Sequence, residues 1–228
     1  MITQDFDGAN EWVTASNPTM PPWVEWTAGQ PMSVPSNTAI FHDGSAADTV
    51  YLLKSGKVLI FSSSIEGHEI GYSIIAPGEL FGLAALAGSP IRENVSAIAL
   101  TKCDLIAIDR SDFQNALHNH PELAPVIITT LVRRLQERTQ QLAEVVLSGL
   151  SVRLAKWLLQ SAIESSTAES GKLASFDYSQ KLIGAMLGVS REAVNRKLRQ
   201  WSNAGIIELD GKLIRIRNRD ELQRLARE

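Results

Sequence analysis

Three charged side chains near the C-terminus have the types and the spacing that contact base pairs in DNA. Arg191, Glu192 and Arg196 fall within two turns of a predicted helix, where residues 192 and 196 share one face and residue 191 lies at its leading edge. An Arg guanidinium donates two hydrogen bonds to guanine O6 and N7, and a Glu carboxylate accepts one from cytosine N4. The alternative is an ordinary surface ion pair between Glu192 and Arg196 at i and i+4. The sequence around them favours contact with bases.

Seven neighbouring polar residues are expected to assist this contact, from phosphates or from the helix ends. Cations beside a base-contacting helix position it without discriminating sequence, because phosphates are the same at every step. The seven residues are Ser179, Ser190, Asn195, Lys197, Arg199, Lys212 and Arg215.

The surrounding residues predict a helix-turn-helix. Gln180–Leu187 and Arg191–Asn203 are the two helices, with Ser179 and Ser190 as their N-caps and Gly188 as the break between them. The residues that join the helices are apolar, with one glycine small enough to allow a close approach. They are Ile183, Gly184, Leu187, Val189, Val194, Leu198 and Trp201.

A β-hairpin is predicted after the second helix. Ile206–Leu209 and Lys212–Ile216 are apolar strands joined at Asp210-Gly211, a pair typical of a tight hairpin turn. The hairpin makes the module a winged helix-turn-helix, whose second helix fits the major groove, about 12 Å wide. Residues 151–228 hold 14 Lys/Arg against 9 Asp/Glu, whereas residues 1–150 hold 8 against 16. Only the C-terminal segment is therefore expected to meet a polyanion.

The preceding residues predict an α+β order of domains. Short apolar runs separated by glycine turns indicate an antiparallel, jelly-roll-like β-roll over residues 31–117. Residues 1–30, with Trp12, Trp23 and Trp26, are expected to form a leader packed on it, and a long helix over residues 118–149 to precede the winged module at 150–228. The expected roll strands are Val50–Leu53, Val58–Phe61, Ile70–Ile75, Val95–Leu100 and Leu105–Ile108.

The long helix carries a narrow apolar stripe in steps of three and four residues, the pattern of a coiled-coil seam. Ordinary core packing gives the same spacing. The stripe lasts about three heptads, however, and the opposite face is charged or amidated, which favours self-pairing into a two-fold dimer. Gly149 then offers a hinge before a helix over Val152–Ile163. The seam residues are Ile128, Leu131, Leu135, Arg138, Leu142 and Val145.

Composition excludes several other classes of protein. The chain has 228 residues, of which 44% are hydrophobic and 21% charged, and this argues against a mainly disordered chain. No apolar run approaches the ~18 residues of a membrane span, and residues 1–11 are too acidic for a secretory signal. The single cysteine, Cys103, excludes a disulfide, a four-cysteine iron–sulfur cluster and a zinc finger within one chain. We expect a cytoplasmic protein without a metal or cofactor.

The segment 183–196 closely resembles the recognition motif of the cyclic-AMP receptor protein/fumarate–nitrate regulator (CRP/FNR) family. The resemblance covers about residues 35–220 and includes the turn Pro77–Gly82. It implies a prokaryotic homodimeric transcription factor that binds a two-fold symmetric operator and contacts RNA polymerase. Arg191, Glu192 and Arg196 match the family's three base-contacting positions. Arg191, which the oxygen-sensing branch lacks, favours a TGTGA-like half-site, and Asn195 could change preference outside the G·C pairs.

The resemblance also implies a cyclic-nucleotide pocket, whose residues are altered here. The position of the acid that meets the ribose is Leu83, the arginine for the cyclic phosphate is kept as Arg92, and the serine position beside it is Glu93. The helix positions that meet the purine are Arg138 and Thr139. Leucine cannot accept the ribose hydrogen bond, and Glu93 places an anion where a phosphate would bind. We therefore expect that cyclic nucleotide does not control this protein in the usual way.

Other means of control stay open. Arg138, paired with Glu93 or Glu137, could lock the long helix in the DNA-binding state without a ligand. A different small ligand in the roll, haem with an axial Cys or His, and a redox switch at Cys103 are alternatives. Cys103 is predicted to lie in a turn beside Asp104. The candidate axial ligands are Cys103, His42, His68, His118 and His120.

A cupin-like metal enzyme is the alternative from another functional class. Such a site clusters two or three histidines with a glutamate on barrel strands. The predicted roll offers only His42 and His68, which are widely spaced, and the sequence contains no Ser-His-Asp arrangement or glycine-rich phosphate loop. We therefore expect that the protein is not an enzyme.

Overall fold

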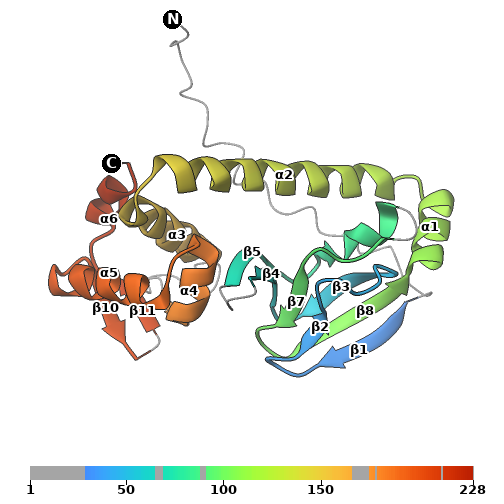
Figure 1. The fold of residues 1–228 in the computed structure, drawn as a ribbon, viewed down its shortest axis with the longest axis horizontal. Coiled ribbons are helices and arrows are strands. Elements are labelled where there is room, and N and C mark those ends of the chain that lie inside the picture. Colours follow the sequence, from blue (N-terminus) through green and yellow to red (C-terminus); the bar gives the residue numbers. More distant parts are fainter. Residues whose placement is uncertain are drawn as a thin grey trace, which may run out of the picture. The chain divides into compact units, whose positions relative to one another are not determined.

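The structure is a computed structural model that describes residues 29–64, 69–87, 91–165, 175–177, 179–211 and 213–227. The described residues form two compact units, and Figure 1 labels their elements. One unit lies within Met1–Val58 and Ile74–Leu135, and the other within Leu59–Ser73 and Gln136–Glu228. The expected leader lies outside the described residues except for its last two positions, and His68 and Lys212 also lie outside them.

Two four-stranded sheets build the N-terminal roll. The first has the order β1 (Gln30–Val34), β8 (Cys103–Asp109), β3 (Thr49–Ser55) and β6 (Leu80–Phe81). The second has the order β2 (Ala39–Phe41), β7 (Ser96–Ala99), β4 (Val58–Ser63) and β5 (Glu69–Ile75). The pairs β1–β8, β3–β8, β3–β6 and β2–β7 are antiparallel and join strands far apart in the chain. The predicted α+β fold with an antiparallel roll is confirmed.

Strand β8 corrects the prediction for Cys103. This cysteine was expected in a turn, but it begins β8, and its side chain is fully buried. Its neighbours Lys102 and Asp104 are exposed, and Leu105 is buried again. Successive side chains of a strand point to opposite faces, so the two charged neighbours reflect alternation in a strand rather than a turn.

The short 3-10 helix η1 (Leu83–Ala87) lies between β6 and β7, and two helices, not one, follow the last strand of the roll. They are α1 (Arg110–Asn119) and α2 (Leu123–Leu147). Pro121 and its neighbours were expected to begin the long helix, but they separate α1 from α2. Helix α1 was not predicted, because Phe113 is its only fully buried residue and its apolar periodicity is weak. In the described part of the chain, no helix is long and apolar enough to cross a bilayer.

A buried ion pair holds the first half of α2 on the roll. Arg133 Nη2 donates to Glu79 Oε1 at 3.0 Å, and Glu79 Oε2 accepts from the Ala76 N–H at 2.6 Å. Arg134 donates to the carbonyl oxygen of Leu80. Glu79 is 7% exposed, and removing one partner of a buried pair leaves an uncompensated charge. The helix is therefore fixed by contacts within the protein.

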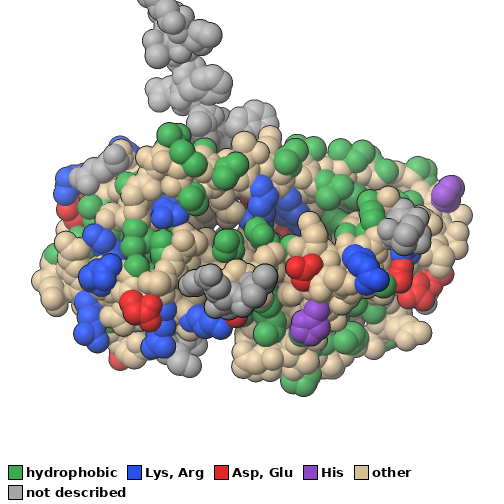
Figure 2. Space-filling model, in the orientation of Figure 1, with side chains coloured by type: hydrophobic (Ala, Val, Ile, Leu, Met, Phe, Trp, Pro, Cys, Tyr) green, Lys and Arg blue, Asp and Glu red, His purple; other side chains and the backbone are tan. Residues whose placement is uncertain are grey.

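The opposite face of α2 is apolar and exposed. Val132 and Val146 are exposed beside this stripe, Leu147 is exposed at the last residue of the helix, and Arg138 is half-buried. In Figure 2, hydrophobic side chains line the upper edge, where Figure 1 places α2. A contiguous apolar surface of this kind marks an interaction site. The other five predicted seam residues are 46–69% exposed: Ile128, Leu131, Leu135, Leu142 and Val145.

The second unit contains the predicted winged helix-turn-helix. Its helices are α3 (Leu150–Ser165), α4 (Gln180–Leu187), α5 (Arg191–Asn203) and α6 (Arg219–Leu225). Its sheet has the order β10 (Ile207–Asp210), β11 (Leu213–Ile216) and β9 (Ser175–Asp177). Helices α4 and α5 have the predicted bounds. Asp210 belongs to the hairpin strand, where it pairs with Leu213, and Gly211 follows with φ +60°. Strand β9 and helix α6 were not predicted.

Replacing Gly184 tests the close contact inside the helix-turn-helix. A Cβ at Gly184 would lie 2.7 Å from the carbonyl oxygen of Val189, too close for any side chain. Gly184→Ala should lower the free energy of unfolding by about 1–3 kcal/mol in urea titrations. Gly149→Ala is the matched control, since nothing lies within 4 Å of the added Cβ, and it should change stability by at most about 0.5 kcal/mol. Equal stability of Gly184→Ala and wild type would contradict the packing described.

Candidate nucleic-acid interface and effector pocket

Three local features set the geometry of the helix-turn-helix. Ser179 Oγ accepts from the Leu182 N–H and Ser190 Oγ from the Ala193 N–H, each at 3.2 Å. Between the helices, Gly188 has φ +63°, a conformation that favours glycine. Both predicted caps and the glycine break are therefore present. Each capping hydroxyl keeps its O–H as a donor, so contact of the two serines with DNA stays a prediction.

The inner face of α5 is buried in the apolar core of the module. Val194 and Leu198 are fully buried, and Trp201 is 4% exposed. An arginine of α3 stabilises the C-terminal end of α4, where the turn begins. Arg153 Nη1 donates to the Leu187 carbonyl oxygen at 2.7 Å. The apolar face of α5 is thus buried against the rest of the module. The other elements supply Leu154, Leu158, Ile183, Ile207 and Ile214 to this core.

The outer face of α5 presents the predicted base-contacting residues. Arg191, Glu192 and Arg196 are all exposed. Among the described residues, none of these three forms a hydrogen bond or ion pair through its side chain, so the surface pair between Glu192 and Arg196 is not formed. Arg199 is exposed as well. Figure 2 shows Lys and Arg side chains gathered over the region where Figure 1 places α5 and the hairpin.

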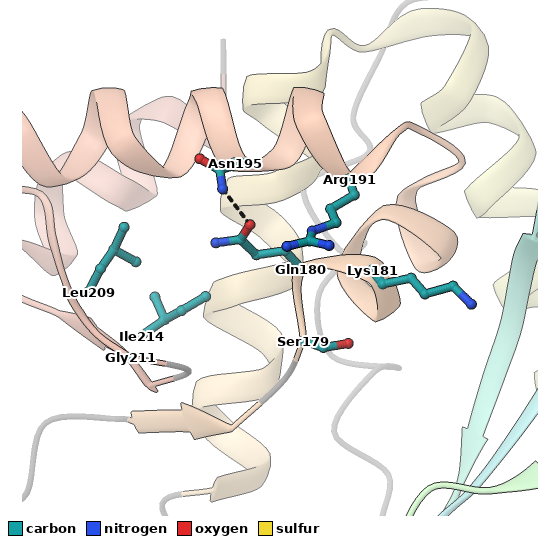
Figure 3. A pocket seen from close by; sticks show the side chains of 8 residues that line it. All are labelled: Ser179, Gln180, Lys181, Arg191, Asn195, Leu209, Gly211 and Ile214. Carbon is teal, nitrogen blue, oxygen red and sulfur yellow. Dashed lines mark hydrogen bonds between the residues drawn. The ribbon is translucent and has the colours of Figure 1, made fainter. Parts of the chain in front are cut away.

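A cleft of about 370 Å³ opens between α4, the start of α5 and the hairpin. Figure 3 shows the Arg191 side chain extending from α5 toward Gln180 on this side of the module. Asn195 Nδ2 donates to Gln180 Oε1 at 2.7 Å, which joins the two helices. Sequence analysis did not single out Gln180, because only the three-dimensional packing brings residues 180 and 195 together. The cleft is lined by Ser179, Gln180, Lys181, Arg191, Asn195, Leu209, Gly211 and Ile214.

Two predicted phosphate contacts already have partners in the protein. Arg215 Nη2 lies 3.1 Å from Asp210 Oδ2, and Arg215 Nη1 lies 3.8 Å from Glu208 Oε1. Lys197 Nζ donates to Gln200 Oε1 at 2.9 Å. These are exposed or half-buried interactions that contribute at most about 1 kcal/mol, so they do not prevent contact with phosphates. The roles of Arg215 and Lys197 stay predictions.

The predicted effector positions in the first unit differ in burial. Leu83 on η1 is half-buried, and Arg92 is exposed, with Nη1 donating to the Gly44 carbonyl oxygen at 2.6 Å. Glu93 is 5% exposed, and burial raises the pKa of its carboxyl group above the ordinary value. Burial and, more weakly, the Glu93 charge raise the pKa of Tyr51. The Tyr51 ring stacks on Phe81 with centroids 5.0 Å apart. An acid thus lies beside aromatic rings.

The two effector positions on α2 belong to the second unit. Arg138 is half-buried, with its guanidinium 5.5 Å from the centroid of the Tyr72 ring. It also donates to Gln141 Oε1. Burial lowers the pKa of Arg138, and the Glu137 charge opposes this shift. Thr139 is exposed. The charge of Glu137 therefore favours the protonated form of Arg138. The proposed pairing of Arg138 with Glu93 stays a hypothesis.

Two of the three histidines in the described residues contact their own segment of chain, and the third, His42, is exposed. His118 Nδ1 lies 2.8 Å from the Gln114 carbonyl oxygen, and His120 Nδ1 lies 3.3 Å from Glu122 Oε1. No group of three or more His, Cys, Asp or Glu residues in the described ranges is arranged to hold a metal ion.

Comparison with known proteins identifies matches to both halves of the chain. A cyclic nucleotide-binding domain model matches residues 31–120, and a Crp-like helix-turn-helix domain model matches residues 152–225. The CRP-like cAMP-activated global transcriptional regulator of Mycobacterium tuberculosis is 32% identical over 87% of this chain and 88% of its own. The cyclic AMP receptor protein of Thermus thermophilus is 29% identical over 84% and 86%. The structure of FixK2 from Bradyrhizobium japonicum is similar in fold, with a TM-score of 0.74 and 22% identity over 86% and 96% of the two chains.

Replacing Glu93 tests the cost of burying its carboxyl group. Because the pKa is raised in the folded state, the unfolded chain loses its proton first, and stability falls as pH rises above the unfolded pKa of about 4.3. Glu93→Gln should raise the midpoint of thermal unfolding at pH 7, and the gain should vanish below about pH 4. Glu192→Gln is the control, because this glutamate is exposed and its side chain has no hydrogen bond or ion pair among the described residues. A Glu93→Gln effect that does not vary with pH would contradict this explanation.

Proposed function

The chain belongs to the CRP/FNR family of DNA-binding transcription regulators, and from this premise we propose that it acts as a homodimer on a palindromic operator with TGTGA-like half-sites. The observation that carries the proposal is the exposure of Arg191, Glu192 and Arg196 on one face of α5. Each arginine can contact a guanine and the glutamate a cytosine, so together they match a half-site rich in G·C pairs. The members of this family are transcription regulators, not enzymes.

The apolar stripe on α2 supports the homodimer. Proteins of this family dimerise. Leu135 and Leu142 are 67% and 69% exposed, one heptad apart, and pairing with a second copy of the same helix would bury both. A two-fold dimer presents two copies of α5, which explains why the operator would be a palindrome. Contact with RNA polymerase remains a prediction from the family resemblance.

Selection of bound sites from random duplexes tests this proposal. The wild-type protein should select a palindrome, and a duplex with one scrambled half-site should bind much more weakly. Arg191→Ala and Arg196→Ala should each cost about 1–3 kcal/mol in fluorescence anisotropy titrations and relax one G·C pair, because each removes a bidentate contact with guanine. Arg219→Ala, an exposed arginine on α6, is the matched control. A monomeric chain that binds the palindrome no better than bulk genomic fragments would refute the proposal.

We further propose that cyclic nucleotide does not control this regulator in the usual way. Leu83 lacks an acceptor for a ribose hydroxyl, and the buried Glu93 carboxyl stands where a cyclic phosphate would bind. A cyclic phosphate at that site would be repelled by the ionised Glu93 carboxylate, or Glu93 would first have to take up a proton. The second candidate is a cyclic-AMP-gated regulator, which the two cAMP-binding or cAMP-activated relatives favour.

Arg138 is our candidate for the group that replaces a ligand. Its guanidinium interacts with the face of the Tyr72 ring and with Gln141, and it lies within the predicted seam. A cation–π contact of a partly buried arginine contributes about 0.5–2 kcal/mol. These contacts would hold the second half of α2 in the DNA-binding state.

Operator affinity with and without cyclic AMP distinguishes the two candidates. We expect the affinity of the purified protein to be the same in both conditions. Arg138→Ala should weaken operator binding by about 0.5–2 kcal/mol, while Arg138→Lys, which keeps a cation over Tyr72, should retain most of it. A large gain in affinity on adding cyclic AMP would reject ligand-independent binding in favour of the second candidate.

A further inference from the structure

The hydrogen bond between Asn195 and Gln180 bears on which bases α5 contacts. Asn195 lies in the second turn of α5, next to Arg196 and four residues after Arg191, so it shares the face of the base-contacting residues. It is half-buried, whereas Arg191, Glu192 and Arg196 are exposed. Its Nδ2 donates to Gln180 Oε1 at 2.7 Å, and Gln180 is the first residue of α4 (Figure 3). The bond thus ties a groove-facing side chain to the other helix.

The chemistry of a carboxamide shows what remains for DNA. Asn195 has two N–H donors and one carbonyl acceptor, and only one N–H is given to Gln180. Neither carboxamide makes a further side-chain hydrogen bond among the described residues. The carbonyl oxygen and the second N–H of Asn195 are therefore available together. An acceptor beside a donor is the pattern that matches adenine, whose N6 amine donates and whose N7 accepts in the major groove.

The bond to Gln180 also restricts rotation of the Asn195 carboxamide, because the two amides keep the bond only if they turn together. Rotation of the Asn195 amide by half a turn would bring its carbonyl oxygen against Gln180 Oε1, so the bond would be lost unless Gln180 turned as well. A side chain held in one rotamer loses less conformational entropy on binding. The remaining carbonyl oxygen and N–H of Asn195 match adenine rather than guanine, which presents two acceptors on the same edge.

We propose that Asn195 is a specificity-determining residue that contacts an adenine beside the G·C pairs, and that Gln180 is the positioning residue that orients it. The proposal rests on the binding of α5 in the major groove, as proposed above. Sequence analysis expected an auxiliary role for Asn195 and an effect on preference outside the G·C pairs, and the proposal assigns to it a contact with one particular base.

Site selection with full-length Asn195→Ala tests the base contact. One A·T position in each half-site should lose its preference, and affinity for the wild-type site should fall about tenfold, while the G·C positions stay selective. Arg196→Ala, examined in parallel, should relax a G·C pair instead. An equal loss of affinity for all sequences would overturn the proposal, because it would indicate a phosphate contact or a structural role.

Two substitutions of Gln180 test the positioning role. Gln180→Met has a similar length but no acceptor, so it should relax the same A·T position as Asn195→Ala. Gln180→Glu keeps an acceptor oxygen for Asn195 Nδ2 and should preserve the preference at that position, even where its charge weakens binding overall. Gln200→Met is the matched control, since Gln200 is an exposed glutamine on α5 that bonds Lys197.

The combined variant separates the remaining outcomes. Gln180→Met added to Asn195→Ala should cause no further loss of discrimination if the two residues act as one unit. Thermal unfolding of each variant checks that the fold is intact.

If Gln180→Met leaves the A·T preference unchanged, the positioning role is wrong. If the wild type selects a palindrome without TGTGA while Asn195→Ala still relaxes an A·T pair, the half-site assignment fails and this inference stands. If the wild type selects no site at all, both fail.

Discussion

The burial of one face of α5 is the constraint on which the DNA-binding half of the protein depends. Arg191, Glu192 and Arg196 remain outside because Val194 and Leu198 are inside, and a helix with this division cannot rotate without exposing its apolar side. The same core joins α3, α4 and the hairpin, so their positions are set together. The close approach at Gly184 then fixes the separation of the two helices. Exposed side chains gain a defined geometry from contacts on the other side of their own helix.

The accuracy of the sequence predictions follows from how local the signals are. The bounds of α4 and α5 were correct because each end has its own cap or glycine break within a few residues. Cys103 was placed wrongly because the alternation of β8 depends on pairing with β1 and β3, which lie far away in the chain. The bond between Asn195 and Gln180 could not be predicted for the same reason. Sequence analysis could predict the exposed residues of the candidate site. It could not predict the hydrogen bond from Asn195 to Gln180, which depends on the packing of two helices.

The N-terminal half combines a retained fold with altered chemistry in its predicted pocket. Leu83 packs against the apolar core of the roll, and the backbone of Glu93 is hydrogen-bonded to Gly44 and Ser45, so a residue of either type at these positions serves the fold whether or not a nucleotide binds. Meanwhile the Glu79–Arg133 pair holds the first half of α2 on the roll by contacts within the protein. A ligand could move α2 from one placement to another only if it bound the protein more tightly in one of the two conformations. Under the proposal, the contacts of Arg133 and Arg138 would supply such a bias within the protein itself, and this is the physical reason for proposing control without cyclic nucleotide.

The hairpin completes this argument about specificity. Arg215 lies near Glu208 and Asp210 of the neighbouring strand β10, and Arg217 pairs with Glu208, so the charge of these two arginines is partly balanced. An arginine that must leave a carboxylate partner before it contacts a phosphate adds less affinity than an unpaired arginine does. The net release of counterions from such a contact is also smaller. Discrimination between operator and bulk DNA then rests more heavily on α5, where Arg191, Glu192 and Arg196 have no partner among the described residues.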